Sequence, residues 1–308
     1  RSSDLYGWDT RGDRWRLAHV LEQSSINGEV LVDTAADYGF GEAEQAVGAA
    51  VQLASGSGVV PRFRICTKLG RLPLARSAVR REREFVSQNY LESGLCRSDE
   101  LLAGRRCFGQ RWLRASLENS RQRLGHTLDL VLLQEPEWLR TTPGFSRSLA
   151  LAFEVLEDAR SAGWLSAYGI SSFFGLAARP DHPLALDLVE VTRLACSVGG
   201  NHHGLAVVQM PVCAIVPGQL RAAMRACAKA ADCGLAVIGV SPLRRGRALS
   251  LLPPGTIEEH DRDWTVAQFL IRRALSTGIA CCVVGTTDPV HAMQATTAAA
   301  VSTDPADD

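Results

Sequence analysis

The chain has 308 residues, of which 46% are hydrophobic and 21% charged, an ordinary globular composition at a length that excludes a small module. Its 33 basic residues balance 33 acidic ones, and this net charge of zero argues against nucleic acid or an anionic membrane as the main partner. No apolar run is long enough to span a membrane.

Short apolar runs alternate with amphipathic segments along the whole chain. Most of the runs lack alternating polar residues, which is typical of parallel strands covered on both faces. We expect strands at residues 29–33, 62–68, 128–134, 165–171, 206–210, 235–240 and 280–285. Spacing of apolar residues at helical intervals predicts helices at residues 13–25, 42–53, 110–124, 145–162, 184–196, 218–231, 265–275 and 289–299. In the fourth helix, Glu154, Glu157 and Asp158 are expected to face solvent.

Seven strands and eight helices in alternation predict a single α/β domain over residues 1–308, a (β/α)8 TIM barrel whose first strand is missing or degraded. Leu5, Tyr6 and Gly7 are the candidate remnant of that strand. The alternative is a doubly wound open sheet, but no G-x-G-x-x-G turn follows an early strand.

Residues 71–109 interrupt this alternation, because they are rich in arginine and show no clear strand pattern. Arginine and glutamate alternate over residues 80–84, which predicts a solvated helix. We interpret the segment as a surface insertion, with a lid over the substrate as the alternative. The polar tail at 302–308 is expected to fray.

Nine cysteines are scattered between Cys66 and Cys282, and no C-x-x-C pair occurs. Cys66, Cys213, Cys281 and Cys282 lie in or beside predicted strands, so we expect buried, reduced thiols in an intracellular compartment, either the cytosol or an organelle matrix reached after removal of a targeting segment. Neighbouring residues of a strand point to opposite faces, which argues against a redox pair at Cys281 and Cys282. No metal site is predicted, since adjacent imidazoles at His202 and His203 do not reach one ion.

Asp33 ends the first predicted strand, Tyr38 lies on the loop that follows, and Lys68 ends the next strand. In a barrel of this kind, the carboxyl ends of the strands carry the chemistry. A carboxylate and a phenol held there suggest a proton donor with electrostatic support, whereas Lys68 by itself fits an ordinary ion pair with Asp33.

Further short motifs follow Tyr38 along the chain, at residues 42–48, 65–68, 116–125, 128–130, 168–172, 209, 241–246 and 285–289. Together with residues 32–39, they resemble the aldo-keto reductase family, in this order, over about residues 29–300. The insertion and the run from Gln134 to Glu137 resemble a subgroup that carries His-Asn-Pro-Glu there, some of whose members act on sugars or small aldehydes.

The resemblance implies reduction of an aldehyde or ketone by hydride from NADPH, with NADH as the alternative cofactor. It implies that Tyr38 is the general acid, supported by Lys68 and Asp33, and that Gln134 faces the carbonyl. It also implies a cofactor site made of Ser171, Ser172, Gln209, Ser241, Leu243, Gly246, Gly285, Thr286 and His291.

Several positions depart from the family pattern. Gln134 stands where the family has histidine, and an amide can donate a hydrogen bond but cannot titrate. Val212 replaces a tyrosine that stacks on the nicotinamide, and His291 replaces an arginine. The basic turn at 244–247 either meets the pyrophosphate or is simply solvated.

These departures leave two interpretations. The first is an active reductase, an NADP-dependent oxidoreductase with a small carbonyl substrate. The second is a catalytically impaired barrel, a pseudoenzyme that serves as a structural or regulatory subunit of a larger protein complex. Neither involves nucleic acid or a membrane span.

Overall fold

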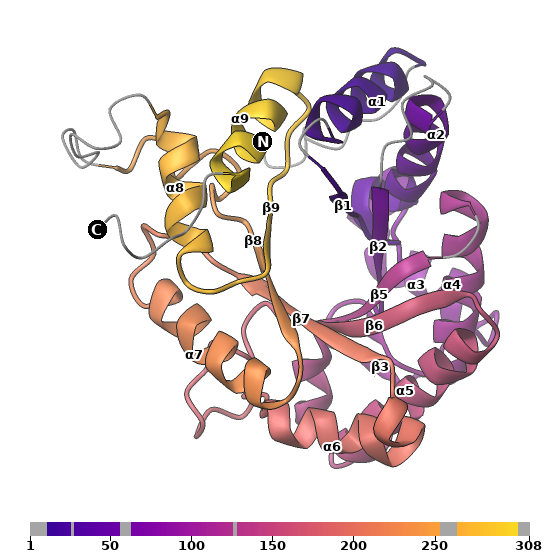
Figure 1. Cartoon of the computed structure of the whole chain (residues 1–308). Helices are drawn as coiled ribbons and strands as arrows, with labels where there is room; N and C mark the ends of the chain where they lie inside the picture. Colours follow the sequence, from indigo (N-terminus) through magenta and orange to yellow (C-terminus); the bar gives the residue numbers. More distant parts are fainter. Residues whose placement is uncertain (1–10, 26–27, 56–62, 126–127, 253–263, 301–308) are drawn as a thin grey trace.

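A computed structural model describes residues 11–25, 28–55, 63–125, 128–252 and 264–300 of the chain. Seven parallel strands form one sheet in the order β1-β2-β5-β6-β7-β8-β9, which curls into a nearly closed barrel with helices around it (Figure 1). The strands are β1 (Val30–Asp33), β2 (Phe63–Leu69), β5 (Leu128–Gln134), β6 (Leu165–Ser171), β7 (Leu205–Pro211), β8 (Ala236–Val240) and β9 (Cys281–Val283).

The eight predicted helices are confirmed, and their bounds lie close to the expected ones. They are α1 (Arg11–Ser25), α2 (Ala43–Ser55), α4 (Gln110–Leu124), α5 (Phe145–Ser161), α6 (Leu188–Gly199), α7 (Gln219–Asp232), α8 (Val266–Leu275) and α9 (Pro289–Ala300). The start of α6 lies four residues later than its predicted start at residue 184. Asp187 ends the preceding loop there, because its side chain accepts a hydrogen bond from the Val189 backbone N–H at 3.1 Å and caps the helix.

The barrel is open between β1 and β9, which do not pair with each other in the described part of the chain. Helix α1 lies at this opening and contacts both α2 and α9 (Figure 1). Its apolar side chains at Leu17, Ala18 and Leu21 are buried in the main core. The prediction of a (β/α)8 barrel without its first strand is therefore confirmed, whereas the proposed remnant at Leu5, Tyr6 and Gly7 lies outside the described residues.

Two apolar layers hold the barrel together. Inside it, Cys66, Leu130, Leu132 and Ile238 form a small cluster, and Cys281 packs against them. Outside it, the opposite faces of the strands pack against the helices, and Cys282 belongs to this layer. The prediction that Cys281 and Cys282 point to opposite faces is therefore confirmed.

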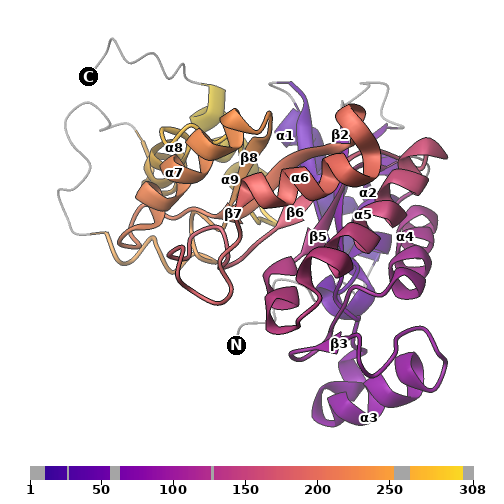
Figure 2. The same cartoon turned by 90° about the horizontal axis from the view of Figure 1, so that it is seen from below.

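The insertion after β2 is more ordered than the sequence pattern indicates. Helical segments at Arg76–Arg81, Glu82–Val86 (α3) and Ser87–Leu91 are followed by the short antiparallel strands β3 (Leu101–Leu102) and β4 (Arg106–Cys107). Figure 2 shows α3 protruding from the barrel. The solvated helix expected at 80–84 is present, but the expectation of a segment without strands is wrong, because strands this short leave no pattern in the sequence.

One glutamate does not lie where helix periodicity places it. Glu154 and Asp158 are exposed as expected, but Glu157 is buried. Its carboxylate accepts hydrogen bonds from the Tyr168 hydroxyl at 2.9 Å and from the Gly204 backbone N–H at 2.7 Å. The prediction that Glu157 faces solvent is therefore wrong, because two polar groups beneath α5 require an acceptor.

In the described part of the chain, no helix combines the length and the apolar character needed to cross a bilayer.

Candidate active site

Asp33 and Lys68 form a buried ion pair at the carboxyl ends of β1 and β2. Lys68 Nζ lies 2.5 Å from Asp33 Oδ2 and donates a second hydrogen bond to the Thr34 carbonyl at 2.9 Å. The exposed fraction is only 2% for the Lys68 side chain and 7% for that of Asp33. Burial on its own is costly for both charges, so each depends on the other and on these hydrogen bonds.

Tyr38 lies on the turn that follows β1, next to this pair. The Lys68 ammonium nitrogen is 4.9 Å from the centroid of the Tyr38 ring. Burial lowers the pKa of Lys68, but the charge of Asp33 and the nearby Tyr38 phenol outweigh burial, so the pKa lies above its ordinary value. Lys68 is therefore charged at physiological pH and favours loss of the Tyr38 proton.

Two residues predicted to bind the cofactor extend the ion pair across the barrel. Gln209 Nε2 donates to Asp33 Oδ1 at 2.8 Å, and Ser171 Oγ donates to Gln209 Oε1 at 2.7 Å. Both oxygens of the Asp33 carboxylate are thus engaged, one by Lys68 and one by Gln209. This network holds the carboxylate in one orientation.

Gln134 ends β5, and its strand register places it opposite Ser171. Its exposed fraction is 7%, and its Oε1 has no hydrogen-bond partner among the described residues. Because the oxygen and nitrogen of an amide are assigned from their surroundings, the structure establishes one buried amide atom without a partner. A buried polar atom of this kind is suited to bind a polar group of a ligand.

The remaining cofactor-site predictions fall into two groups. Ser241, Leu243, Gly246, Gly285, Thr286 and His291 lie after β8, after β9 and on α9, where all are exposed or half-buried. By contrast, Ser172 is buried, and its Oγ accepts a hydrogen bond from the Leu176 backbone N–H at 3.2 Å. Val212 is fully buried, so it offers no surface on which a ring stacks.

Four charged residues, linked to the Tyr38 turn through Asp37, are not indicated by any sequence pattern. Glu135 pairs with Arg106 at 2.7 Å and with Arg71 at 3.6 Å, and Arg71 Nε also lies 3.5 Å from Asp37 Oδ2. Burial raises the pKa of Asp37, although Arg71 opposes this shift. The arginine guanidinium of Arg106 lies 4.8 Å from the Trp138 ring centroid. The sequence shows that the insertion is rich in arginine, but this composition does not indicate which carboxylates or rings the arginines contact.

Comparison with known proteins supports the same family as the sequence motifs. The model of the aldo/keto reductase family matches residues 16–179, more than half of the chain. A D-threo-aldose 1-dehydrogenase of Pseudomonas sp is 33% identical over 178 residues, which cover 56% of this chain and 49% of that protein. The match thus spans about half the length of this relative.

Solved structures show the same fold at low sequence identity. An aldo-keto reductase of Bacillus halodurans in its holo form is 16% identical and superposes with a TM-score of 0.61, covering 97% of this chain and 85% of that one. An aldo/keto reductase of Klebsiella pneumoniae in complex with NADP and acetate is 18% identical, with a TM-score of 0.54 and coverage of 96% and 83%. The family match, the barrel and the strand-end site lead to one conclusion: this chain belongs to the aldo/keto reductase family.

Proposed function

We propose that this protein is an NADPH-dependent oxidoreductase that reduces the carbonyl group of a small aldehyde or ketone, with Tyr38 as the proton donor. The observation that carries the proposal is the buried Lys68 ammonium, held by Asp33 at 2.5 Å and lying 4.9 Å from the Tyr38 ring. When bound, the nicotinamide would supply hydride to the carbonyl carbon. Tyr38 would give its proton to the carbonyl oxygen, and Lys68 would stabilise the phenolate left behind.

The residues around this pair fit a nicotinamide cofactor in part. Gln134 presents a buried amide atom without a partner, and the rim at Ser241, Gly246 and Gly285 is exposed enough to receive a long ligand. The turn at 244–247 carries three arginines that suit the pyrophosphate of either cofactor, and we favour NADPH because a related aldo/keto reductase was solved with NADP. Val212 removes one stacking surface, which weakens binding without abolishing it.

We further propose a substrate of the size of a small sugar. The Pseudomonas relative is named for the oxidation of an aldose, which is the reverse of carbonyl reduction at the same type of site. The buried amide atom of Gln134 that has no partner among the described residues suits a hydroxyl group of a polyhydroxylated compound, because a hydroxyl both donates and accepts hydrogen bonds. We assign Trp138, four residues after Gln134 and with its ring centroid 4.8 Å from the Arg106 guanidinium carbon, as an apolar wall of this pocket.

Cofactor titration tests the proposal. NADPH added to the purified chain should quench tryptophan fluorescence in a saturable manner at micromolar concentration, at the low end of the range of about 1 µM to 1 mM typical of enzyme KM values. NADH in a parallel titration should bind more weakly if the site selects for the 2′-phosphate of NADPH. No saturation by either cofactor up to millimolar concentration would rule the proposed activity out.

A second candidate function is that of a catalytically impaired barrel retained in a larger complex. The observation that favours it is Gln134, because this side chain cannot relay a proton at the position where the family has histidine. This function predicts co-purification with other subunits and no turnover of sugars or small aldehydes. A monodisperse chain that turns over such a substrate would contradict it.

Replacement of Gln134 by leucine tests whether its amide orients the carbonyl group of the substrate or has no part in the reaction. If the amide binds the carbonyl, Gln134→Leu should lower kcat/KM by about tenfold, the value of one hydrogen bond, at nearly unchanged side-chain volume. Gln134→His keeps a donor and should retain or raise kcat/KM. Steady-state kinetics with a test aldehyde measures both, and equal values for the leucine variant and the unaltered chain would exclude Gln134 from the site.

A further inference from the structure

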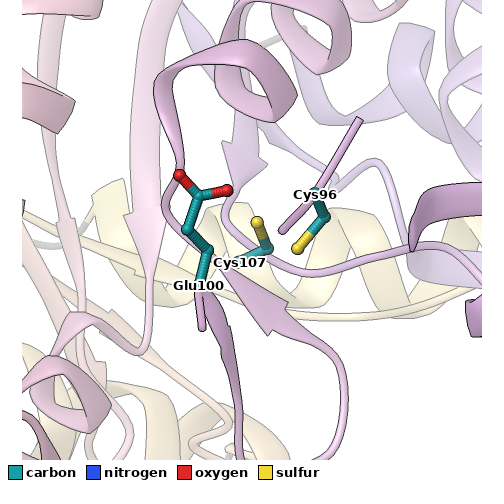
Figure 3. A group of neighbouring side chains, drawn as sticks. All are labelled: Cys96, Glu100 and Cys107. Atoms are coloured by element: carbon teal, nitrogen blue, oxygen red, sulfur yellow. The ribbon is translucent and has the colours of Figure 1, made fainter. Parts of the chain in front are cut away.

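Three potential metal ligands meet within the insertion, away from the site described above. Cys96 lies in the loop before β3, Glu100 directly precedes β3, and Cys107 lies on β4. Their sulfur and carboxylate ligand atoms all lie within 4.8 Å of one another, and Figure 3 shows the three side chains grouped together. Both thiols are buried, with exposed fractions of 1% for Cys96 and 0% for Cys107.

We propose that Cys96, Glu100 and Cys107 bind one thiophilic divalent cation of the zinc class. In a tetrahedral zinc site, metal–ligand bonds of about 2.0–2.3 Å place neighbouring ligand atoms roughly 3.5–3.8 Å apart. The ligand atoms of the observed group already lie within 4.8 Å of one another, about 1 Å above this spacing. On binding, each thiol releases its proton to solvent, two sulfurs and one carboxylate oxygen bond the cation, and a water completes the shell.

The groups behind these ligands are arranged as in metal sites, where hydrogen bonds to the ligands fix their orientation. The Arg97 backbone N–H donates to Glu100 Oε2 at 3.0 Å. The Gly109 backbone N–H donates to the Cys107 sulfur. The backbone N–H groups of Cys96 and Cys107 are themselves bonded, to Tyr90 and Gly70 at 2.9 Å each, so both cysteines are held by the fold.

Gly109 gives Glu100 the space to reach the two sulfurs. Its φ of −62° and ψ of 136° are open to any residue, so conformation does not require glycine there. A Cβ at this position would nevertheless lie 2.4 Å from Glu100 Oε2 and 2.5 Å from its carboxyl carbon. The carboxylate also lies at the N-terminus of α4, where the helix field favours its ionised, metal-binding form.

A disulfide between Cys96 and Cys107 is the competing use of the two sulfurs, and it leaves Glu100 unexplained. A disulfide uses the two sulfurs only and gives the Glu100 carboxylate no role. A divalent cation uses all three groups, because two thiolates and a carboxylate compensate its charge.

A metal at this position would stabilise the wall of the proposed active site. Arg106, next to Cys107 in sequence, contacts Glu135 and the ring of Trp138. Arg106 lies on β4, which is only two residues long. The cation would thus fix β4 to the loop at Cys96, and the proposal holds whether or not the barrel is an active reductase.

Cadmium titration of the full chain tests this site. The chain is reduced, freed of metal with a chelator, and titrated with Cd²⁺ while ultraviolet absorption of cadmium–thiolate bonds is recorded. One equivalent should bind, and at a free concentration of about a hundred times Kd the Tm should rise by about 5 °C. Cys96→Ser and Cys107→Ser should abolish the absorption, and Glu100→Gln and Gly109→Ala should weaken binding by at least about tenfold.

Cys227→Ser and Cys233→Ser are matched controls, because both remove half-buried cysteines of the α7 region. They should leave the titration unchanged. Circular dichroism without metal shows whether each variant is folded. If a cysteine variant is unfolded, weaker Cd²⁺ binding by folded Glu100→Gln supports the site, and unchanged binding by that variant contradicts it. Three results would each overturn the proposal. The first is no saturable binding of Cd²⁺, and the second is binding that persists in each of the single variants Cys96→Ser and Cys107→Ser. The third is a Cys96–Cys107 disulfide in a chain that takes up no Cd²⁺ after reduction.

Discussion

Replacing Tyr38 by phenylalanine is expected to lower kcat for carbonyl reduction by roughly 10²–10⁴-fold, the usual contribution of a positioned proton donor. The change removes one hydroxyl group and keeps the ring, whose centroid lies 4.9 Å from Lys68 Nζ. Binding of NADPH should therefore be unaffected, with the same Kd in the fluorescence titration. The loss should appear in kcat measured at saturating substrate.

Tyr168→Phe is the matched control for this experiment. It also removes one phenolic hydroxyl, but the Tyr168 hydroxyl donates to Glu157 beneath α5 and not to the strand-end site. It should leave kcat unchanged while lowering the free energy of unfolding by about 1–2 kcal/mol. A Tyr38→Phe variant with unaltered turnover would show that the proton comes from elsewhere.

The second large effect concerns the buried ion pair. Asp33→Asn leaves the Lys68 ammonium buried without its counter-charge, and breaking such a pair costs about 3–5 kcal/mol of the free energy of unfolding at neutral pH. The exposed fraction of the Lys68 side chain is 2%, so water offers little compensation. Urea unfolding followed by tryptophan fluorescence measures the loss. Lys68→Met added to Asp33→Asn should recover much of it, because the double variant buries no unpaired charge.

The pH dependence of the free energy of unfolding of these variants follows from the direction in which the pKa of Lys68 is shifted. In the unaltered chain the pKa of Lys68 is raised, so the stabilisation is complete below the unfolded-state pKa of about 10.4 and disappears as pH rises through the folded-state value. In Asp33→Asn, burial without the carboxylate lowers that pKa instead. The stability deficit should then shrink as pH rises towards about 10. A double variant less stable than Asp33→Asn would contradict this account of the pair.

Most of the fold was predictable from local patterns. The runs at 128–134 and 165–171 correspond to β5 and β6 residue for residue, since strands covered on both faces are mostly apolar and do not alternate regularly with polar residues. The helix at 110–124 was predicted with the same bounds, because its apolar spacing is periodic and ends at Gly125. The insertion was not predictable to this degree, because its strands are two residues long and its contacts are distant in sequence.

The alternation of strands and helices, and the places of Asp33 and Lys68 near strand ends with Tyr38 on the loop between, followed from the pattern of the sequence, whereas Ser171 and Gln209 were implied by the resemblance to aldo-keto reductases. The partners of these residues were decided only by the tertiary structure. Gln209 lies 176 residues from Asp33 and bonds it only because the barrel curls. Periodicity describes one element at a time, whereas burial of Glu157 and grouping of Cys96, Glu100 and Cys107 arise where separate elements pack together.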